Sequence, residues 1–364
     1  MLNDTIQREL SNNSFWNRTQ PRIHTRNAKE ELIKSIFLAA YIIVFVIGLA
    51  GNSLTCYVII KKRFMRKAIH FYTLNMAIAD LVVILFYVPV EIIKNEHDMV
   101  WTMGEAICRI NYCIIPLSLA ASICTLVAIT INRHRGVTKP LKWRGDTRSI
   151  VKISIPLVWL AGVITCIPFM FVVVLKEFPP GSGIHYCYED WGNRYSERAY
   201  WITMFCLQVI LPLIIMIFLN AHMLLIMNRY DLRHKSNHKR IIRMVVVLVV
   251  VYAVCTSPQH VVYFWLTYGN LTTIMDVDTQ KIVFKIANLL LIIQIAVNPI
   301  IYGTLGELRP SFSKVLTLSR FKAVLSFRQT KTTQEDIFSR GSHSPDLDYF
   351  SPVTYRDGRY DLDI

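Results

Sequence analysis

Asp80 is an acid in the middle of an apolar stretch of sequence, where a carboxylate is costly unless it faces water, an ion or polar partners. Three polar residues in other apolar stretches could meet it: Ser122, Gln294 and Asn298. Either a bound ion or a structural hydrogen-bond network with a protonated Asp80 would satisfy this requirement. The sequence leaves both open, and both place Asp80 in the interior of a bundle.

Eight cysteines divide into two groups by the sequence around them. Six lie within apolar stretches, where cysteine usually behaves as a small buried apolar residue: Cys56, Cys113, Cys124, Cys166, Cys206 and Cys255. Only Cys108, which begins an apolar stretch, and Cys187, which lies in a connecting segment, fall on the side that the charge distribution assigns to the oxidising exterior. We therefore expect a disulfide between them, which would tie a long connecting segment across the mouth of the bundle.

An acidic string follows Cys187 directly and reads Tyr188, Glu189, Asp190 and Trp191. Either acid could bind an arginine side chain through two parallel hydrogen bonds, and a solvated loop face is the alternative. Further candidate ligand-binding residues lie at the same side: Pro89, Glu91, Trp101, Gln259, His260, Tyr263 and Lys285. The connecting segments of this side hold 10 Asp and Glu against 7 Lys and Arg, so the entrance would attract a cationic ligand.

Seven apolar stretches separate and position these residues. Each is about 20 residues or longer, which is the length a helix needs to cross a bilayer. They lie near 33–60, 69–93, 108–131, 150–175, 200–227, 241–267 and 282–305. The composition agrees, because 53% of the 364 residues are hydrophobic and only 18% are charged. A soluble fold could not bury this much apolar sequence, and unpaired backbone groups are not tolerated in lipid, so we predict an all-α membrane protein with a seven-helix bundle.

The net charge of +15 is distributed by membrane side and does not indicate nucleic-acid binding. The first, third and fifth connecting segments together hold 18 Lys and Arg, whereas the second, fourth and sixth hold 7. Positively charged segments stay on the cytoplasmic side. The chain is therefore expected to be a multi-pass plasma membrane protein with its N-terminus outside and its C-terminus inside.

The expected organisation has four parts. Residues 1–32 form an extracellular tail without a cleavable signal, 33–306 the bundle, 307–318 a short amphipathic helix, and 319–364 a disordered cytoplasmic tail. Four glycosylation sequons fall on the predicted outer side, at Asn3, Asn12, Asn17 and Asn270. This position agrees with the orientation that the charges predict.

A set of motifs, about one for each stretch, makes the chain similar to a known family. They are Gly51-Asn52, Leu74-Asn75-Met76-Ala77-Ile78-Ala79-Asp80, Trp101-Thr102-Met103-Gly104 before Cys108, Arg133 at 25 residues after Cys108, Trp159, Pro212, Pro258 and Asn298-Pro299-Ile300-Ile301-Tyr302. From residue 33 to about 318 the chain resembles rhodopsin-like (class A) G-protein-coupled receptors.

The resemblance implies roles for several of these residues. It implies an allosteric sodium ion at Asp80, within a network that includes Ser122, Gln294, Asn298 and Tyr302. It also implies that Arg133 lies at the centre of the G-protein contact. The helix kinks at Pro258 in the sixth stretch and at Pro299 in the seventh are implied to move when the inner side of the bundle opens. Arrestin, receptor kinases and membrane lipids are implied as further partners, and a cofactor is not.

The chain departs from the family pattern at the inner end of the third stretch. The usual Asp-Arg-Tyr reads Asn132-Arg133-His134, and His238 stands where many relatives place an acidic partner for the arginine. The loss of ion pairs on two sides leads us to expect raised basal signalling, because buried charge pairs can bias a two-state bundle. The alternative is a quiet receptor whose resting state is held by other groups.

Two more departures affect the fifth and sixth stretches. The usual Cys-Trp-x-Pro reads Cys255-Thr256-Ser257-Pro258, so the aromatic switch residue is absent and Tyr252 could carry part of its packing role. Asn220 replaces the tyrosine expected eight residues after the fifth-stretch proline.

The resemblance also narrows the class of ligand. Amine receptors of the family carry an aspartate at the position of Ile115, and opsins carry a lysine at the position of Ile292, so neither an amine nor retinal is expected. The acidic string resembles the corresponding loop of receptors for amidated Arg-Phe peptides, and more loosely that of neuropeptide Y and tachykinin receptors. A cationic, amidated neuropeptide is therefore the expected ligand.

Three other classes remain as alternatives. An atypical receptor that is constitutively active or does not signal would share the same motifs. A small transporter or channel would commonly show internal repeats, and none relates the two halves of this sequence. An enzyme would need paired carboxylates, an activated nucleophile, a metal cluster or a phosphate loop on one membrane face, and the sequence offers none of these.

Overall fold

The structure is a computed structural model that describes residues 28–61, 68–138, 147–229, 235–268, 277–306, 308–314 and 317. Seven helical stretches within this part of the chain are long and apolar enough to cross a membrane. They run over Ala28–Lys61, Ala68–Glu96, Gly104–Thr138, Ser149–Val172, Arg194–Met227, Ile242–Trp265 and Thr279–Thr304. The predicted seven-helix bundle is confirmed.

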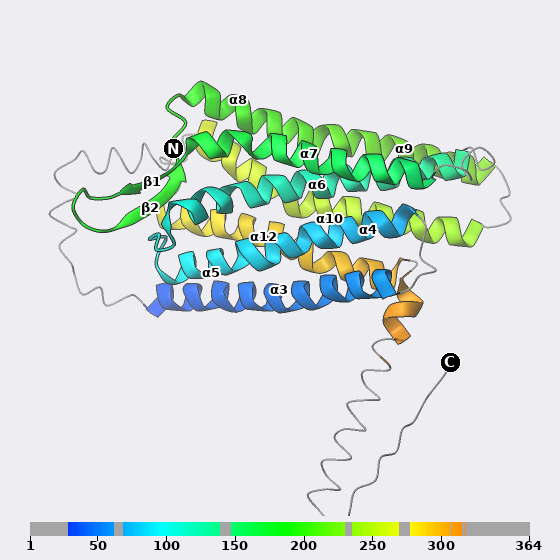
Figure 1. Ribbon diagram of the computed structural model, residues 1–364, viewed down its shortest axis with the longest axis horizontal. Helices are drawn as coiled ribbons and strands as arrows, with labels where there is room; N and C mark the ends of the chain where they lie inside the picture. The colour runs from blue at the N-terminus through cyan, green and yellow to red at the C-terminus, as the bar shows by residue number, and fades with distance from the viewer. Residues whose placement is uncertain are drawn as a thin grey trace, which may run out of the picture. The chain divides into compact units, whose positions relative to one another are not determined.

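The helices lie side by side and form one bundle (Figure 1). Its elements in chain order are α3 (Ala28–Lys61), α4 (Ala68–Val82), η1 (Val83–Tyr87), α5 (Val88–Glu96), α6 (Gly104–Thr138), α7 (Thr147–Val172), α8 (Arg194–Phe205), η3 (Cys206–Ile210), α9 (Leu211–Arg229), α10 (Lys235–Tyr268) and α12 (Val277–Thr304). The bundle belongs to a unit that ends at Phe312, and the second unit, Ser313–Ile364, is described only at residues 313, 314 and 317.

Two of the spanning stretches contain a π-helical turn that ends two residues before a proline. Proline removes one backbone donor and clashes with the carbonyl four residues earlier. For Pro89 that carbonyl belongs to Leu85 in η1, and for Pro212 it belongs to Gln208 in η3. A π turn widens the helix locally, so both prolines are accommodated without ending the span. The freed Gln208 carbonyl accepts a hydrogen bond from the Tyr252 hydroxyl at 2.9 Å.

A β-hairpin caps one end of the bundle, which we call the hairpin end (Figure 1). Strand β1 (Val173–Glu177) pairs antiparallel with β2 (His185–Glu189), with Leu175 opposite Cys187. The prediction that the fourth helix continues to residue 175 is therefore wrong by three residues. Val173 and Val174 are β-branched and leave the helix for the strand, where such side chains pack well.

The outer surface of the bundle is apolar and its interior contains polar groups. Large apolar side chains such as Phe171, Phe218 and Leu225 are exposed, whereas Asn52 and Asp80 are buried. This arrangement suits a helix bundle that is surrounded by lipid, because polar side chains can then pair only with one another.

A short helix follows α12, as predicted. Residues 309–314 are helical, and Leu308 and Phe312 are buried. The side chains of Val315 and Leu316, which complete the predicted apolar face, lie outside the described residues.

Candidate functional site

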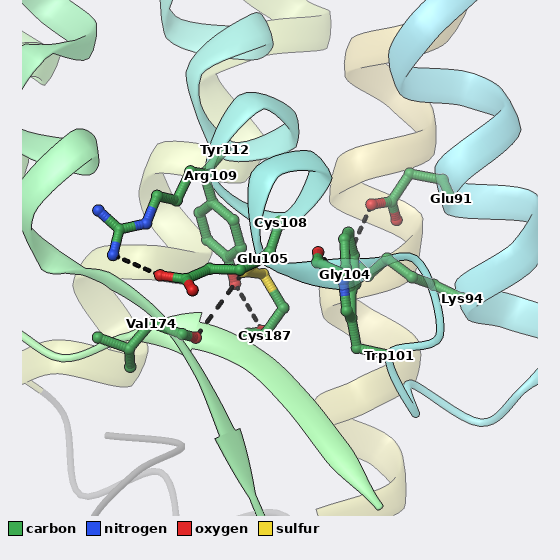
Figure 2. The surroundings of a disulfide bond; sticks show 10 residues. All are labelled: Glu91, Lys94, Trp101, Gly104, Glu105, Cys108, Arg109, Tyr112, Val174 and Cys187. Atoms are coloured by element: carbon green, nitrogen blue, oxygen red, sulfur yellow. Dashed lines mark hydrogen bonds and ion pairs between the residues drawn. A yellow bond between two sulfur atoms is a disulfide. The ribbon is translucent and has the colours of Figure 1, made fainter.

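The predicted disulfide joins Cys108 at the start of α6 to Cys187 in β2 (Figure 2). Two further contacts fix the same corner. The Tyr112 hydroxyl donates a hydrogen bond to the Cys187 carbonyl at 3.3 Å, and the indole nitrogen of Trp101 donates to the Gly104 carbonyl at 2.7 Å. The hairpin is therefore held against α6 by a covalent bond and by hydrogen bonds, and β2 has a fixed position at the hairpin end.

Glu189 lies two residues after Cys187 on β2, among aromatic rings. Its carboxylate accepts a hydrogen bond from the Trp191 indole at 2.7 Å. The Trp191 ring lies 5.0 Å from that of Tyr200, and Trp201 stacks on Tyr263 at 4.0 Å. Burial raises the pKa of Glu189 to about 7, because the aromatic surroundings disfavour the charged carboxylate. A half-buried acid of this kind would gain from a cationic partner.

Asp190 has a different environment although it is the next residue. Its carboxylate pairs with the Lys176 ammonium at 2.7 Å, across the hairpin. This hydrogen bond lowers the pKa of Asp190 and raises the pKa of Lys176. Asp190 thus has a cation from its own chain, whereas Glu189 has a neutral donor.

A second acid, Glu91, is buried in the first turn of α5. One carboxylate oxygen pairs with the Lys94 ammonium at 2.6 Å, and the other accepts a hydrogen bond from the Asn288 amide of α12 at 3.3 Å. Lys285, one turn earlier on α12, donates to the Asn95 side chain at 2.8 Å. Glu91 and Lys285 therefore connect α5 to α12.

The two acids act on a common group of tyrosines. Both Glu91 and Glu189 act electrostatically on Tyr112 of α6 and on Tyr263 of α10. The residues predicted for ligand binding therefore converge on the hairpin end of the interior.

The remaining candidates differ in how they face this region. The buried His260 ring lies 5.5 Å from that of Phe205. The Gln259 side-chain oxygen is buried and has no hydrogen-bond partner among the described residues. Ile115 is part of an apolar cluster with Ile84 and Ile292, so it contributes packing at this level of the bundle.

Asp80 lies deep in the interior, with 2% of its surface exposed. The Asn298 amide donates a hydrogen bond to its carboxylate at 3.0 Å, as the sequence suggested. Gln294, the other amide considered for Asp80, instead accepts a hydrogen bond from the Thr256 hydroxyl at 3.0 Å. Ser122 is buried on α6.

The bundle interior contains further buried oxygen atoms besides those of Asp80. The Ser118 hydroxyl and the Asn52 side-chain oxygen are buried without a hydrogen-bond partner among the described residues. Carboxylate, hydroxyl and amide oxygens are the ligands that hard cations prefer. Tyr302, the last member of the predicted network, directs its hydroxyl to the Met76 sulfur at 3.3 Å.

The predicted switch residues lie on α10, which contains Pro258. Tyr252 and Thr256 are both fully buried. The Tyr252 hydroxyl donates a hydrogen bond to the Gln208 carbonyl, and the Thr256 hydroxyl donates one to the Gln294 side chain, each on a neighbouring span. Two hydrogen bonds thus connect this kinked helix to its neighbours where the family has a large aromatic side chain.

At the end of the bundle opposite the hairpin, which we call the far end, Asn132 is buried and Arg133 is half-buried. His134 forms a hydrogen bond with His222 of α9, with 2.7 Å between Nε2 and Nδ1. Residue spacing did not predict this partner, because it does not show which faces of two separate helices meet. The side chain of His238 and the sequons at Asn3, Asn12, Asn17 and Asn270 lie outside the described residues.

Comparison with known proteins gives a family and several relatives. A family model described as 7 transmembrane receptor (rhodopsin family) matches residues 51–302. The pyroglutamylated RF-amide peptide receptor of Rattus norvegicus is 27% identical over 295 residues, which cover 75% of this chain and 68% of that protein. Neuropeptide FF receptor 2 of the same species is 25% identical over 296 residues (76% and 70%). The QRFP-like peptide receptor of Branchiostoma floridae is 28% identical over 291 residues (75% of each).

Proposed function

The chain belongs to the rhodopsin family of seven-transmembrane receptors, and from this premise we propose that it is a cell-surface receptor for an extracellular peptide. The names of its relatives support a peptide ligand, since they are receptors for an RF-amide peptide, for neuropeptide FF and for a QRFP-like peptide. The receptor would activate heterotrimeric G proteins by opening the far end of the bundle, which we assign to the cytoplasm, and the N-terminus would be extracellular.

The observation that carries this proposal is the environment of Glu189. A carboxylate among aromatic rings is suited to a guanidinium group, which can pair with the acid and stack on the rings. We infer that Glu189 binds an arginine side chain of the peptide. Asp190 is less suited, because Lys176 already neutralises it.

The other predicted ligand-binding residues would complete the site around the peptide. The Glu91 carboxylate and the Gln259 side-chain oxygen are both hydrogen-bond acceptors, and the C-terminal amide of the peptide would supply donors. The aromatic rings of Trp191, Trp201 and Tyr263 would pack against an aromatic side chain next to the arginine. A cationic, amidated peptide therefore remains the ligand that we propose.

Further partners follow from the same proposal. Asp80, Ser122 and Asn298 would hold an allosteric sodium ion, whose charge would stabilise the ionised carboxylate. Arg133, with Asn132 and His134 beside it, would lie at the centre of the G-protein contact. Arrestin and receptor kinases would bind the cytoplasmic side, lipids would surround the bundle, and the asparagines of the four sequons would carry glycans.

The proposal can be tested in cells that express the full chain, by recording calcium and cyclic AMP against amidated peptides that end in Arg-Phe or Arg-Tyr. For an active peptide, Glu189→Gln should raise the half-maximal concentration by about 10- to 100-fold, since a buried charge-assisted hydrogen bond is lost. The matched control Asp190→Asn should shift it by less than about threefold, because exposed ion pairs contribute little.

The outcomes separate the parts of the proposal. No response to any peptide, with the receptor present at the cell surface, would contradict the ligand class. A response that Glu189→Gln leaves unchanged would contradict the arginine site but not peptide reception.

A further inference from the structure

His134 and His222 join two spanning helices at the far end of the bundle. The hydrogen bond between His134 Nε2 and His222 Nδ1 measures 2.7 Å, and the two ring centroids are 5.0 Å apart. His222 also stacks on Phe218, one turn earlier on α9, with 5° between the ring planes. The pair is thus a polar connection between these ends of α6 and α9.

An apolar cluster adjoins this hydrogen bond. Val137 lies one turn after His134 on α6, and Met223 and Met227 extend from His222 along α9. Ile242 of α10 packs into the same cluster and is only 4% exposed. At Ile242, α10 is therefore packed against α6 and α9 at the far end.

We propose that His134 and His222 form a latch, a hydrogen bond that holds α6 against α9 in the resting receptor. The latch thereby preserves the apolar site formed by Val137, Met223 and Met227 in which Ile242 packs, which we call its socket. The inference rests on the proposed coupling to G proteins. The acids expected beside Arg133 are missing, because those two positions hold Asn132 and His238. The latch would restrain the resting state at the same end of the bundle. Opening the far end requires Ile242 to leave its socket, and the latch raises the cost of that step.

The chemistry of the latch follows from its two imidazoles. The bond needs one N–H donor and one lone pair, which two neutral rings supply. A single proton leaves the bond intact, because an imidazolium still donates to a neutral ring. Only a second proton would place two N–H groups against each other. The latch should therefore hold at cytosolic pH and open only in acid.

Substitution of His222 tests the latch through basal nucleotide exchange on G proteins in membranes that contain the full-length receptor. His222→Ala should raise basal exchange about three- to tenfold. His222→Asn should keep it near that of the unmodified receptor, since the amide places a hydrogen-bonding atom where Nδ1 stood. His97→Ala, at the hairpin end, is the control for loss of a histidine and should have no effect. Equal basal exchange in the unmodified receptor and His222→Ala, at equal surface amounts, would overturn the proposal.

A second measurement does not depend on the G protein. Zinc coordinates imidazole nitrogens at about 2.0–2.1 Å, so it can replace the shared hydrogen after a small separation of the rings. A fluorophore on Arg243→Cys, at the inner end of α10, should report a more closed state when zinc is added, and His222→Ala should abolish this response. A zinc response that persists in His222→Ala would overturn the latch. A zinc response that requires His222, without nucleotide exchange in any variant, would support the latch and contradict the proposed coupling to G proteins.

Discussion

Neighbouring residues with the same charge have different chemistry in this chain because their surroundings differ. Glu189 is partly buried among rings and has a neutral hydrogen-bond donor, whereas Asp190 pairs with the Lys176 ammonium. The sequence identified the acidic string but could not divide the two roles. That division depends on the pairing of β1 with β2, which places Lys176 within reach of Asp190.

The raised pKa of Glu189 predicts a pH dependence of peptide binding. With the pKa at about 7, the free receptor holds a protonated Glu189 in acid and an ionised one above neutrality. An arginine side chain pairs with the ionised form, so affinity should rise by about tenfold from pH 6 to pH 8. Binding of a labelled active peptide to membranes across this range measures the effect. Glu189→Gln should bind weakly with no such slope, and an equal slope in that variant would assign the titration to another group.

At the scale of elements, hydropathy predicted the spans but not the details that position the site. The seven stretches follow from the length of a bilayer-crossing helix, and each was found near its predicted bounds. The hairpin was missed because Val173–Leu175 continues an apolar run, and strand pairing depends on a partner, His185–Glu189, that lies beyond a loop. The π turns were missed because helix-compatible sequence carries no mark of an extra residue in one turn. His222 was missed for the related reason that periodicity does not fix how two helices face each other.

The close approach of α6 and α7 predicts a strong effect of one methyl group. A Cβ atom on Gly162 would lie 2.7 Å from the Leu117 carbonyl oxygen, which is backbone and cannot move alone. Gly162→Ala should therefore separate the helices and destabilise the receptor by about 1–3 kcal/mol. Gly48→Ala is a matched control, because its nearest contact is the flexible end of the Ile84 side chain. Thermal unfolding of purified receptors should show the larger loss for Gly162→Ala; a larger loss for Gly48→Ala would contradict this account of the packing.

At the scale of the whole molecule, charge rather than shape determines which end faces the cytoplasm. The connecting segments at the far end hold 18 Lys and Arg and those at the hairpin end hold 7, so the far end should stay inside. Because the disulfide and the acidic site lie at the hairpin end, this orientation gives a peptide access to Glu189 and exposes Arg133 to a G protein. The same charge difference thus underlies both halves of the proposed function.

Epitope tags at the two termini test this orientation. An N-terminal tag should stain intact cells, whereas a C-terminal tag should stain only after permeabilisation. Asn270→Gln, in a segment expected at the outer side, should remove one glycan and increase mobility on a gel, because only that side meets the glycosylation machinery. Its matched control is Asn228→Gln, near the far end and outside any sequon, which should leave the glycan mass unchanged. Staining of the C-terminal tag on intact cells would reverse the assignment and place Glu189 in the cytosol, where no extracellular peptide could reach it.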